Sequence, residues 1–310
     1  MKLVARLFAV IALIAVATPL RAATAHADGT AGPGPLVGAA WVAERSNLAS
    51  VVVLDARSNW RAYSRSHIPG AVFTHYIADH WRARRGNVVG MLAPVPYLEN
   101  MIGALGISND DHVVVVAPGN NATDMGIATR IYWTFKVLGH DKVSVLNGGM
   151  RGYLAASLPL SRNLPTSGPR TFKARFRREL LATQDDVRKA LASGGRLIDN
   201  RPPPQFIGKQ KSQAAKRFGT IPSATNAPAI AMTPKDSGFF RRNAAMAELF
   251  NAAGTTTEDD TITFCNTGHW ASVGWFVQSE LMGKKNVRLY DGSIAEWSID
   301  TANPMVRSAK

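Results

Sequence analysis

The stretch FKVLGHDKVSVLNGGMRGY, residues 135–153, decides how the chain is organised, because SELMGKKNVRLYDGSIAEW, residues 279–297, repeats its pattern. Gly139 and Gly283 stand 144 positions apart, and Gly148 and Gly292 keep the same offset. Two more pairs of segments support the repeat: VVVLDARSNW at 51–60 with GRLIDNRPPP at 195–204, and SHIPGA at 66–71 with GTIPSA at 219–224. Several matches of this kind predict two copies of one fold.

Strands alternate with helices in each copy. In the second copy, Thr183 followed by acidic residues favours a helix start, and Gly194 favours the end of that helix. The runs RLID (196–199), TITF (261–264) and VRLYDG (287–292) predict strands, and apolar residues at helical spacing predict a helix over 271–282. This alternation is typical of an α/β fold, in which helices flank a mostly parallel sheet.

The repeat and the composition also set the domain limits. We expect an N-terminal copy over 36–160, a linker over 161–180 and a C-terminal copy over 181–304. Residues 1–27 predict a cleaved signal peptide, because a basic start and a short apolar run lead to the small-residue motif at 25–27. We therefore expect an exported, periplasmic protein with no membrane span in its mature part.

The charge and the cysteine usage limit the chemistry. A formal net charge of +14 favours anionic partners, and an exported protein meets small anions rather than nucleic acid. Cys265 is the only cysteine, so no internal disulfide can form, and its thiol is either buried and inert or reactive. A lone cysteine with scattered histidines has no metal-ligand spacing, so no metal is expected.

The position of Cys265 favours a reactive thiol. Cys265 follows the strand TITF, at the carboxyl edge where parallel sheets bind their ligands. The next residues turn into a helix, whose amides and dipole favour the thiolate as a nucleophile. Gly268 lets the backbone curl closely around the sulfur. The alternative interpretation is a small buried hydrophobic residue at a strand end.

The two-copy plan, together with LDAR, SHIPGA, VLGHDKVSVLNGG and the cysteine loop, resembles the tandem-domain rhodaneses over about residues 36–304. These are the thiosulfate and 3-mercaptopyruvate sulfurtransferases. The resemblance implies an inactive first copy, which has Ala117 at the matching strand end, and a catalytic Cys265 in the second. It implies ping-pong transfer of a sulfane sulfur, through a Cys265 persulfide, from an anionic donor to cyanide or a thiol. No organic cofactor or metal is implied.

The resemblance also assigns a substrate-binding loop, in which several expected charges are missing. The loop is Asn266, Thr267, Gly268, His269, Trp270 and Ala271. The family commonly has cations after the cysteine, and it often has Arg where this chain has Gln205. We expect His269 to supply part of the missing charge, or else the basic residues of the nine-residue insert, namely Lys209, Lys211, Lys216 and Arg217. Asp199, Arg201 and Gln205 are candidates for pairing beside the site or for anion binding.

Three further features are assigned structural roles. Trp270 is expected to pack or to form a wall of the pocket. Asp291 in YDGS is interpreted as a turn former. The basic runs RARR (82–85) and KARFRR (173–178) are interpreted as solvated faces.

Two other functions would use a similar loop or fold. Cysteine phosphatases use a similar loop but need Arg six places after the cysteine, where this chain has Ala271, so that class is disfavoured. A persulfide carrier or binding module that serves one protein partner stays open, because fold does not fix function.

Overall fold

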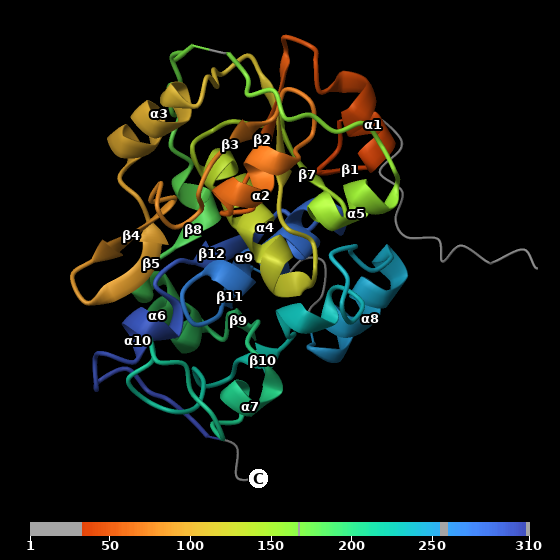
Figure 1. Ribbon diagram of the computed structural model, residues 1–310. Helices are drawn as coiled ribbons and strands as arrows, with labels where there is room; N and C mark the ends of the chain where they lie inside the picture. The colour runs from red at the N-terminus through yellow and green to blue at the C-terminus, as the bar shows by residue number, and fades with distance from the viewer. Residues whose placement is uncertain (1–32, 167, 255–259, 308–310) are drawn as a thin grey trace, which may run out of the picture.

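The computed structural model describes residues 33–166, 168–254 and 260–307. The predicted signal peptide, residues 1–27, lies outside the described residues. Figure 1 shows two α/β halves, with the red-to-yellow first copy above and the green-to-blue second copy below. The prediction of two α/β domains with mostly parallel sheets is confirmed.

The two domains use similar elements in a similar order. The first contains β1 (Leu36–Val37), α1 (Ala39–Arg45), β2 (Val51–Asp55), α2 (Trp60–Arg65), β3 (Val72–Phe73), β4 (Arg82–Arg85), β5 (Val88–Leu92), α3 (Val95–Ala104), β6 (His112–Val116), α4 (Ala122–Val137), β7 (Val143–Leu146) and α5 (Gly149–Ala155). The second contains η1 (Arg178–Leu180), β8 (Leu181–Ala182), α6 (Gln184–Ser193), β9 (Arg196–Asp199), α7 (Pro203–Phe206), β10 (Thr225–Asn226), η2 (Ala229–Ala231), α8 (Asn243–Ala252), β11 (Thr261–Phe264), α9 (His269–Trp275), η3 (Phe276–Leu281), β12 (Val287–Tyr290) and α10 (Ser293–Trp297).

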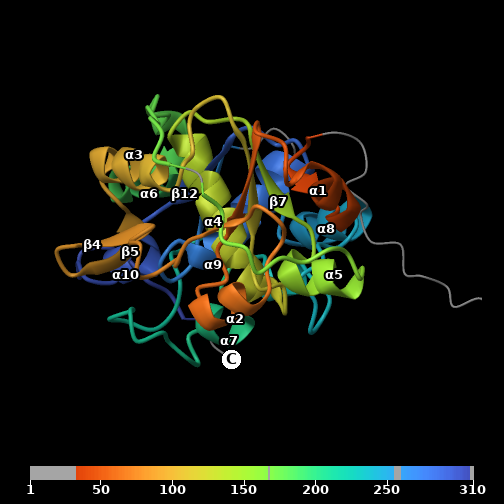
Figure 2. The ribbon, with the colours of Figure 1, turned by 45° about the horizontal axis from the view of Figure 1, so that its top comes forward.

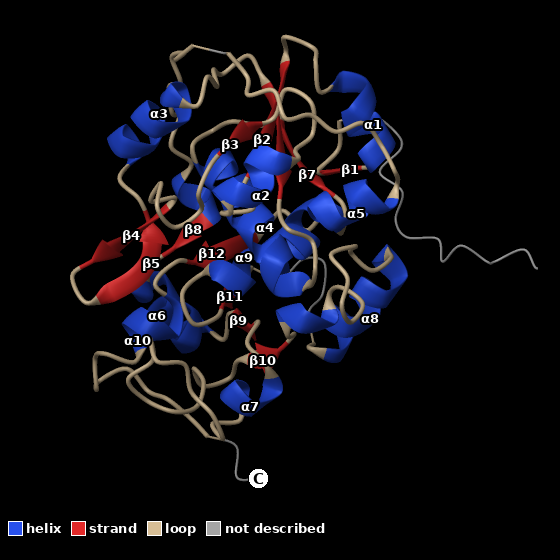
Figure 3. Cartoon of the chain, in the orientation of Figure 1, coloured by secondary structure: helices blue, strands red, loops and turns tan. Residues whose placement is uncertain are grey.

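The repeat in the sequence is a repeat in sheet topology. The strand orders are β1-β7-β6-β2-β3 and β8-β12-β11-β9-β10, and every pairing in both sheets is parallel. Asp55 at the end of β2 pairs with Val116 of β6, and Asp199 of β9 pairs with Phe264 of β11 in the same way. Figure 3 shows the strands of both sheets in red with blue helices around them. The carboxyl edge of each central strand is therefore the equivalent place in the two copies.

Local sequence signals explain most helix limits. Thr183 and Asp186 form a capping box at the start of α6, and Gly194 ends it at φ +75°. The helix predicted over 271–282 starts earlier, at His269, and its last turns, η3, are a π-helix that ends at Leu281. Gly268 has a φ of +73°, a left-handed conformation that turns the chain into the helix two residues sooner than the apolar spacing indicated.

The two domains share one of their hydrophobic cores, and each has a second core of its own on the other face of its sheet. Helices α4 and α9 pack on each other between the two sheets (Figure 1), and their buried aromatic side chains interlock. The Tyr132 ring stands edge-on to Phe276, with centroids 4.9 Å apart, and the Tyr132 hydroxyl donates to Glu280 Oε2 at 2.5 Å. Because this interior is continuous and closely packed, it fixes the position of one domain relative to the other. Nowhere in the described ranges is a helix both apolar and long enough for a bilayer crossing.

The antiparallel hairpin β4–β5 joins the first domain to the second at another point. Figure 2 shows this hairpin beside α10, where Val88 and Met91 pack against Ala295. The backbone amide of Leu92 donates to Asp291 Oδ2 at 2.5 Å. The linker after α5 runs over the surface of the first domain but buries Phe172 in its core.

Candidate active site

Cys265 lies at the carboxyl edge of the second sheet. β11 ends at Phe264, and Cys265, which comes next, is a buried residue with 1% exposure. A tight loop then leads through Gly268 into α9. The cysteine is thus placed where parallel sheets bind ligands, as the sequence predicted, and the first turn of α9 directs backbone amides toward the loop.

Ser293 holds this loop in shape. Its hydroxyl accepts from the amides of Cys265 and Gly268, each at 3.1 Å, and donates to the carbonyl of Tyr290 at 2.8 Å. Ser293 has a φ of +50°, and Gly149 occupies the matching position of the first copy with a φ of +57°. A hydroxyl has one proton and two lone pairs, so these three bonds use its full capacity. The first copy thus lacks both the cysteine and the hydroxyl that shapes the loop.

Arg130 of the first domain contacts the cysteine loop and helps to hold its shape. It is fully buried, and it donates to the carbonyls of Gly268 at 3.2 Å and Gly90 at 3.3 Å. Its guanidinium also pairs with Asp291, and a Cβ atom at Gly268 would collide with it. Asp291 lies at the bend between β12 and α10, as the interpretation of a turn former requires, and its carboxylate also neutralises the buried cation of Arg130.

The first domain forms half of the pocket above Cys265. This pocket has a volume of about 350 Å³ and lies between the domains. Its first-domain residues are Tyr76, Ile77, Arg82, Thr123, Asp124 and Ile127, and its second-domain residues are Ser212, Cys265, Asn266, Thr267, His269 and Trp270. The copy without a cysteine is therefore a structural part of the candidate site.

Arg82 brings a cation that the loop itself lacks. It begins β4, donates to the carbonyl of Thr267 at 3.3 Å and to its hydroxyl at 3.4 Å, and lies over the ring of Tyr76 at 4.9 Å. The interpretation of residues 82–85 as a solvated face was wrong for Arg82 and holds for the exposed Arg84 and Arg85. The missing charge is thus supplied across the domain interface.

His269 is neutral in this site. Its Nε2 faces the carbonyl of Thr123 at 2.9 Å and its Nδ1 faces the hydroxyl of Tyr76 at 3.1 Å. Since a carbonyl only accepts, Nε2 carries the proton and Nδ1 accepts from Tyr76. Burial, followed by the charge of Arg82, lowers the pKa of His269 to about 3 despite the hydrogen bond to Thr123. The expectation that His269 adds positive charge was therefore wrong.

The remaining loop residues have different surroundings. Trp270 lines the pocket and donates from its indole to the hydroxyl of Thr123 at 3.0 Å, whereas Ala271 is fully buried under the loop. Asn266 Nδ2 donates to Gln205 Oε1 at 2.8 Å, and Asn266 Oδ1 is buried with no protein partner. The Oδ1 atom of Asn266 is thus a buried acceptor without a hydrogen bond in the structure.

Arg201 and Asp199 form a buried pair. Arg201 Nε lies 3.0 Å from both carboxylate oxygens of Asp199, and its Nη2 also donates to the carbonyl of Gly219 at 2.9 Å. Both side chains are fully buried, so they hold the chain that follows β9 rather than reach the pocket. Gln205 is the one of the three candidates that contacts the cysteine loop, through Asn266.

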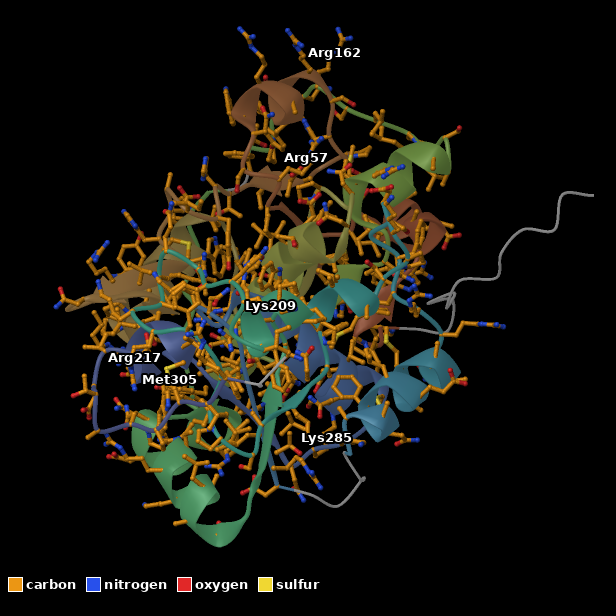
Figure 4. All side chains as sticks on the ribbon, turned by 90° about the horizontal axis from the view of Figure 1, so that it is seen from below. Arg57, Arg162, Lys209, Arg217, Lys285 and Met305 are labelled. Carbon is orange, nitrogen blue, oxygen red and sulfur yellow. The ribbon has the colours of Figure 1, made fainter. Side chains whose placement is uncertain are left out.

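The insert touches the site through Ser212. Figure 4 shows Lys209 and Arg217 on this segment, with Arg217 beside the chain that carries Met305. Arg217 donates to the carbonyls of Trp297, Ser298, Asp300 and Asn303. Lys211 donates to the carbonyl of Ala215 at 3.1 Å. Arg217 therefore ties the insert to the C-terminal segment instead of supplying the charge expected in the pocket.

No sequence motif indicated the site residues Tyr76, Arg82, Thr123 and Arg130. One signal was available for the first two: both follow SHIPGA, and the chain after this motif leaves the carboxyl edge of the first sheet, where ligands bind. The contacts of Thr123 and Arg130 depend on how α4 packs on α9, which no local pattern gives.

Comparisons with known proteins agree with this geometry. The family model described as Rhodanese-like domain matches residues 38–156 and again 183–300. A protein from Saccharopolyspora erythraea, provisionally named thiosulfate sulfurtransferase, is 32% identical over 88% of this chain and 98% of its own length. The sulfur carrier protein TtuD from Thermus thermophilus is 32% identical over 87% of this chain and 95% of its own length.

Solved structures of other proteins share this fold. The 3-mercaptopyruvate sulfotransferase SseA from Escherichia coli superposes with a TM-score of 0.72 at 27% identity, covering 84% of this chain and 98% of that one. The anaerobic ergothioneine biosynthesis enzyme from Chlorobium limicola gives 0.74 at 23% identity over 89% and 71%, a likeness of fold. The chain therefore belongs to the rhodanese family, with two rhodanese domains. It is a sulfurtransferase, as the resemblance predicted.

Proposed function

We propose that this protein moves a sulfane sulfur from a small anionic donor to cyanide or a thiol through a persulfide on Cys265. The observation that carries the proposal is the buried strand-end Cys265 at the base of a pocket that also contains Arg82. Thiosulfate and 3-mercaptopyruvate are the candidate donors, in line with the names of the relatives and of SseA.

Each half of the reaction is a displacement at sulfur. The Cys265 thiolate attacks the outer sulfur of thiosulfate, the sulfur–sulfur bond of the donor breaks, and sulfite leaves with the electron pair. The persulfide keeps one negative charge. Cyanide or a thiolate then attacks its outer sulfur, so that thiocyanate or a new persulfide leaves and the Cys265 thiolate returns. The sulfur stays covalently bound between the two halves, so the proposed cycle uses no organic cofactor and no metal.

The surroundings of Cys265 suit the negative charge that stays on sulfur throughout this cycle. The first-turn amides of α9 and the guanidinium of Arg82 are positive groups fixed before the reaction, which is the arrangement that stabilises developing anions. His269 is neutral, so it orients Tyr76 rather than compensating charge. Burial raises the pKa of Tyr76, and its phenol therefore stays protonated at the pocket wall.

A second candidate is a sulfur carrier that passes its persulfide to one protein acceptor. The similarity to the sulfur carrier protein TtuD favours it. The two candidates differ in turnover, because an enzyme cycles with small acceptors whereas a carrier loads once and waits for its partner. The amount of thiocyanate formed per protein molecule, measured with many equivalents of donor, therefore distinguishes the enzyme from the carrier.

We also propose that the protein is exported to the periplasm, on the basis of the leader-like residues 1–27. Cell fractionation of the full chain tests this. A shortened N-terminus in the periplasmic fraction is the expected result, and full-length protein in the cytoplasm would contradict it.

The first experiment on the reaction is the intact mass of the protein after incubation with thiosulfate and removal of the excess. We expect a gain of one sulfur atom that cyanide removes and that Cys265→Ser never shows. Failure of thiosulfate with success of 3-mercaptopyruvate would change the donor. Failure of both, and of a protein persulfide, would refute the persulfide route.

A further inference from the structure

A second pocket, of about 240 Å³, lies between the domains, and its described lining residues all differ from those of the pocket above Cys265. The first domain contributes the β4–β5 hairpin and the start of α3, and the second contributes α10 and the residues that follow β8 and β12. Figure 2 shows the hairpin beside α10. Because β8 and β12 are parallel strands, the second pocket lies at the carboxyl edge of their sheet, where α/β proteins bind ligands.

Most of the wall of the second pocket is apolar. Met91 and Leu92 of β5 and Val95 of α3 come from the first domain, Leu181 of β8 comes from the second, and Phe176 comes from the linker. Phe176 is 45% exposed, so part of its ring is available to a bound molecule. Walls of this kind favour an apolar group in the ligand.

Three charged side chains are among the described lining residues of the second pocket, and they are not equally neutralised. The carboxylate of Asp291 pairs with Arg130 and accepts from the amide of Leu92. Glu296 and Arg85 line the same pocket, yet within the described ranges neither forms an ion pair. Arg85 donates only to the carbonyl of Leu92, at 3.5 Å. One anion and one cation are therefore available to a ligand.

The Glu296 carboxylate is held at the wall of the second pocket. A Cβ atom at Gly292 would collide with Glu296 Oε2, so the carboxylate lies directly over Gly292, which also lines the pocket. Burial, followed by the negative charge of Glu296, raises the pKa of Tyr290, so its phenol stays protonated beside the carboxylate. A half-buried carboxylate without a cation loses hydration without full compensation, and a cationic group of a ligand would offset this loss.

We propose that the second pocket binds a small zwitterion with an apolar side chain, of the α-amino acid class. The ammonium group faces Glu296, the carboxylate faces Arg85, and the apolar side chain lies against Val95 and Leu181. Opposite charges that line one pocket without pairing with each other suit a ligand that carries both charges. At the ~30 Å³ that a water molecule takes in the liquid, about 240 Å³ holds ~8 non-hydrogen atoms, which is the size of valine. The proposal goes beyond the proposed function and does not depend on it.

Isothermal titration calorimetry of the purified protein with valine, leucine and methionine tests the proposal. We expect saturable binding of one molecule per chain. Leucinamide lacks the carboxylate and 4-methylpentanoate lacks the ammonium group, so each should bind at least ~10-fold more weakly than leucine, which is the effect of one lost hydrogen bond between charged groups. If none of the three amino acids binds saturably, or if either analogue binds as tightly as leucine, the inference is overturned.

Variants assign each charge to its partner. Arg85→Met should bind leucine at least ~10-fold more weakly and should no longer distinguish leucine from leucinamide. Glu296→Gln should in the same way no longer distinguish leucine from 4-methylpentanoate. Arg84→Met is the matched control, since Arg84 is exposed like Arg85 but is not among the described lining residues, and it should bind leucine as wild type does.

Trp270→Ala shows which pocket holds the ligand, because Trp270 lines the pocket above Cys265 and not the second one. Leucine should bind to it as to wild type. Loss of leucine binding in Trp270→Ala, with Arg85→Met unaffected, would place the ligand above Cys265 and overturn the inference. None of these titrations depends on sulfur transfer, so their failure would leave the proposed function standing.

Discussion

Ser293→Ala tests whether one hydroxyl shapes the cysteine loop. The hydroxyl accepts from the amides of Cys265 and Gly268 and donates to the carbonyl of Tyr290. Its removal leaves two buried amides without a partner. Each such group costs ~1–3 kcal/mol, so we expect the free energy of unfolding to fall by ~2–6 kcal/mol.

Ser293→Gly separates the hydrogen bonds from the backbone conformation. Ser293 has a φ of +50°, and glycine stands in the equivalent place of the first copy at +57°. A left-handed conformation costs a residue with a Cβ ~1–2 kcal/mol, and glycine escapes that cost. Ser293→Gly should therefore lose the same hydrogen bonds as Ser293→Ala. Its free energy of unfolding should nevertheless be ~1–2 kcal/mol higher than that of Ser293→Ala.

Urea unfolding followed by tryptophan fluorescence measures these differences, and the rate of sulfur loading on Cys265 reports the loop. Because displacement of a reacting group by ~1 Å can lower a rate about 100-fold, both variants should load much more slowly than wild type. Ser298→Ala is the matched control, since its buried hydroxyl accepts one amide, that of Lys216 at 2.9 Å. Ser298→Ala should therefore lose about half as much free energy of unfolding as Ser293→Ala. If Ser293→Ala loses under ~1 kcal/mol and loads normally, the account of the loop is refuted.

Other perturbations probe the interface and the charges. Arg130→Met should lower the free energy of unfolding by ~3–5 kcal/mol because it leaves the buried carboxylate of Asp291 without its cation. Adding Asp291→Asn should recover a large part of this loss. If the double variant is as unstable in urea as Arg130→Met, the expectation is contradicted. Arg82→Met should raise the KM for thiosulfate about tenfold, whereas the exposed Arg84→Met should leave it unchanged; equal effects in the sulfite-release assay would contradict a specific role for Arg82. Since the pKa of His269 falls from 6.5 to about 3 on folding, the unfolded chain binds the extra proton in that window, and stability falls as pH drops below 6.5. Urea unfolding at pH 7, 6 and 5 should therefore show a smaller pH dependence in His269→Asn than in wild type, and identical slopes would mean that the folded histidine is charged.

The sequence alone determined the architecture of this protein. Glycines at one constant offset, repeated strand motifs and local caps such as Thr183 specify the same α/β unit twice, since each signal acts within a few residues along the chain. Position along the sequence also singled out Cys265, because a residue that follows a buried parallel strand must lie at the carboxyl edge of the sheet.

Only the tertiary structure decided what surrounds the cysteine. Arg82, Tyr76 and Thr123 reach the site because α4 packs on α9 and the β4–β5 hairpin crosses to the second domain. These contacts join residues far apart in the sequence, so neither hydrophobic spacing nor a local motif encodes them. The charge state of His269 was decided in the same way, because burial and a neighbouring cation from the other domain set its pKa. Local sequence therefore gives the fold and the nucleophile, whereas the electrostatics and the shape of the pocket arise only when the two copies pack together.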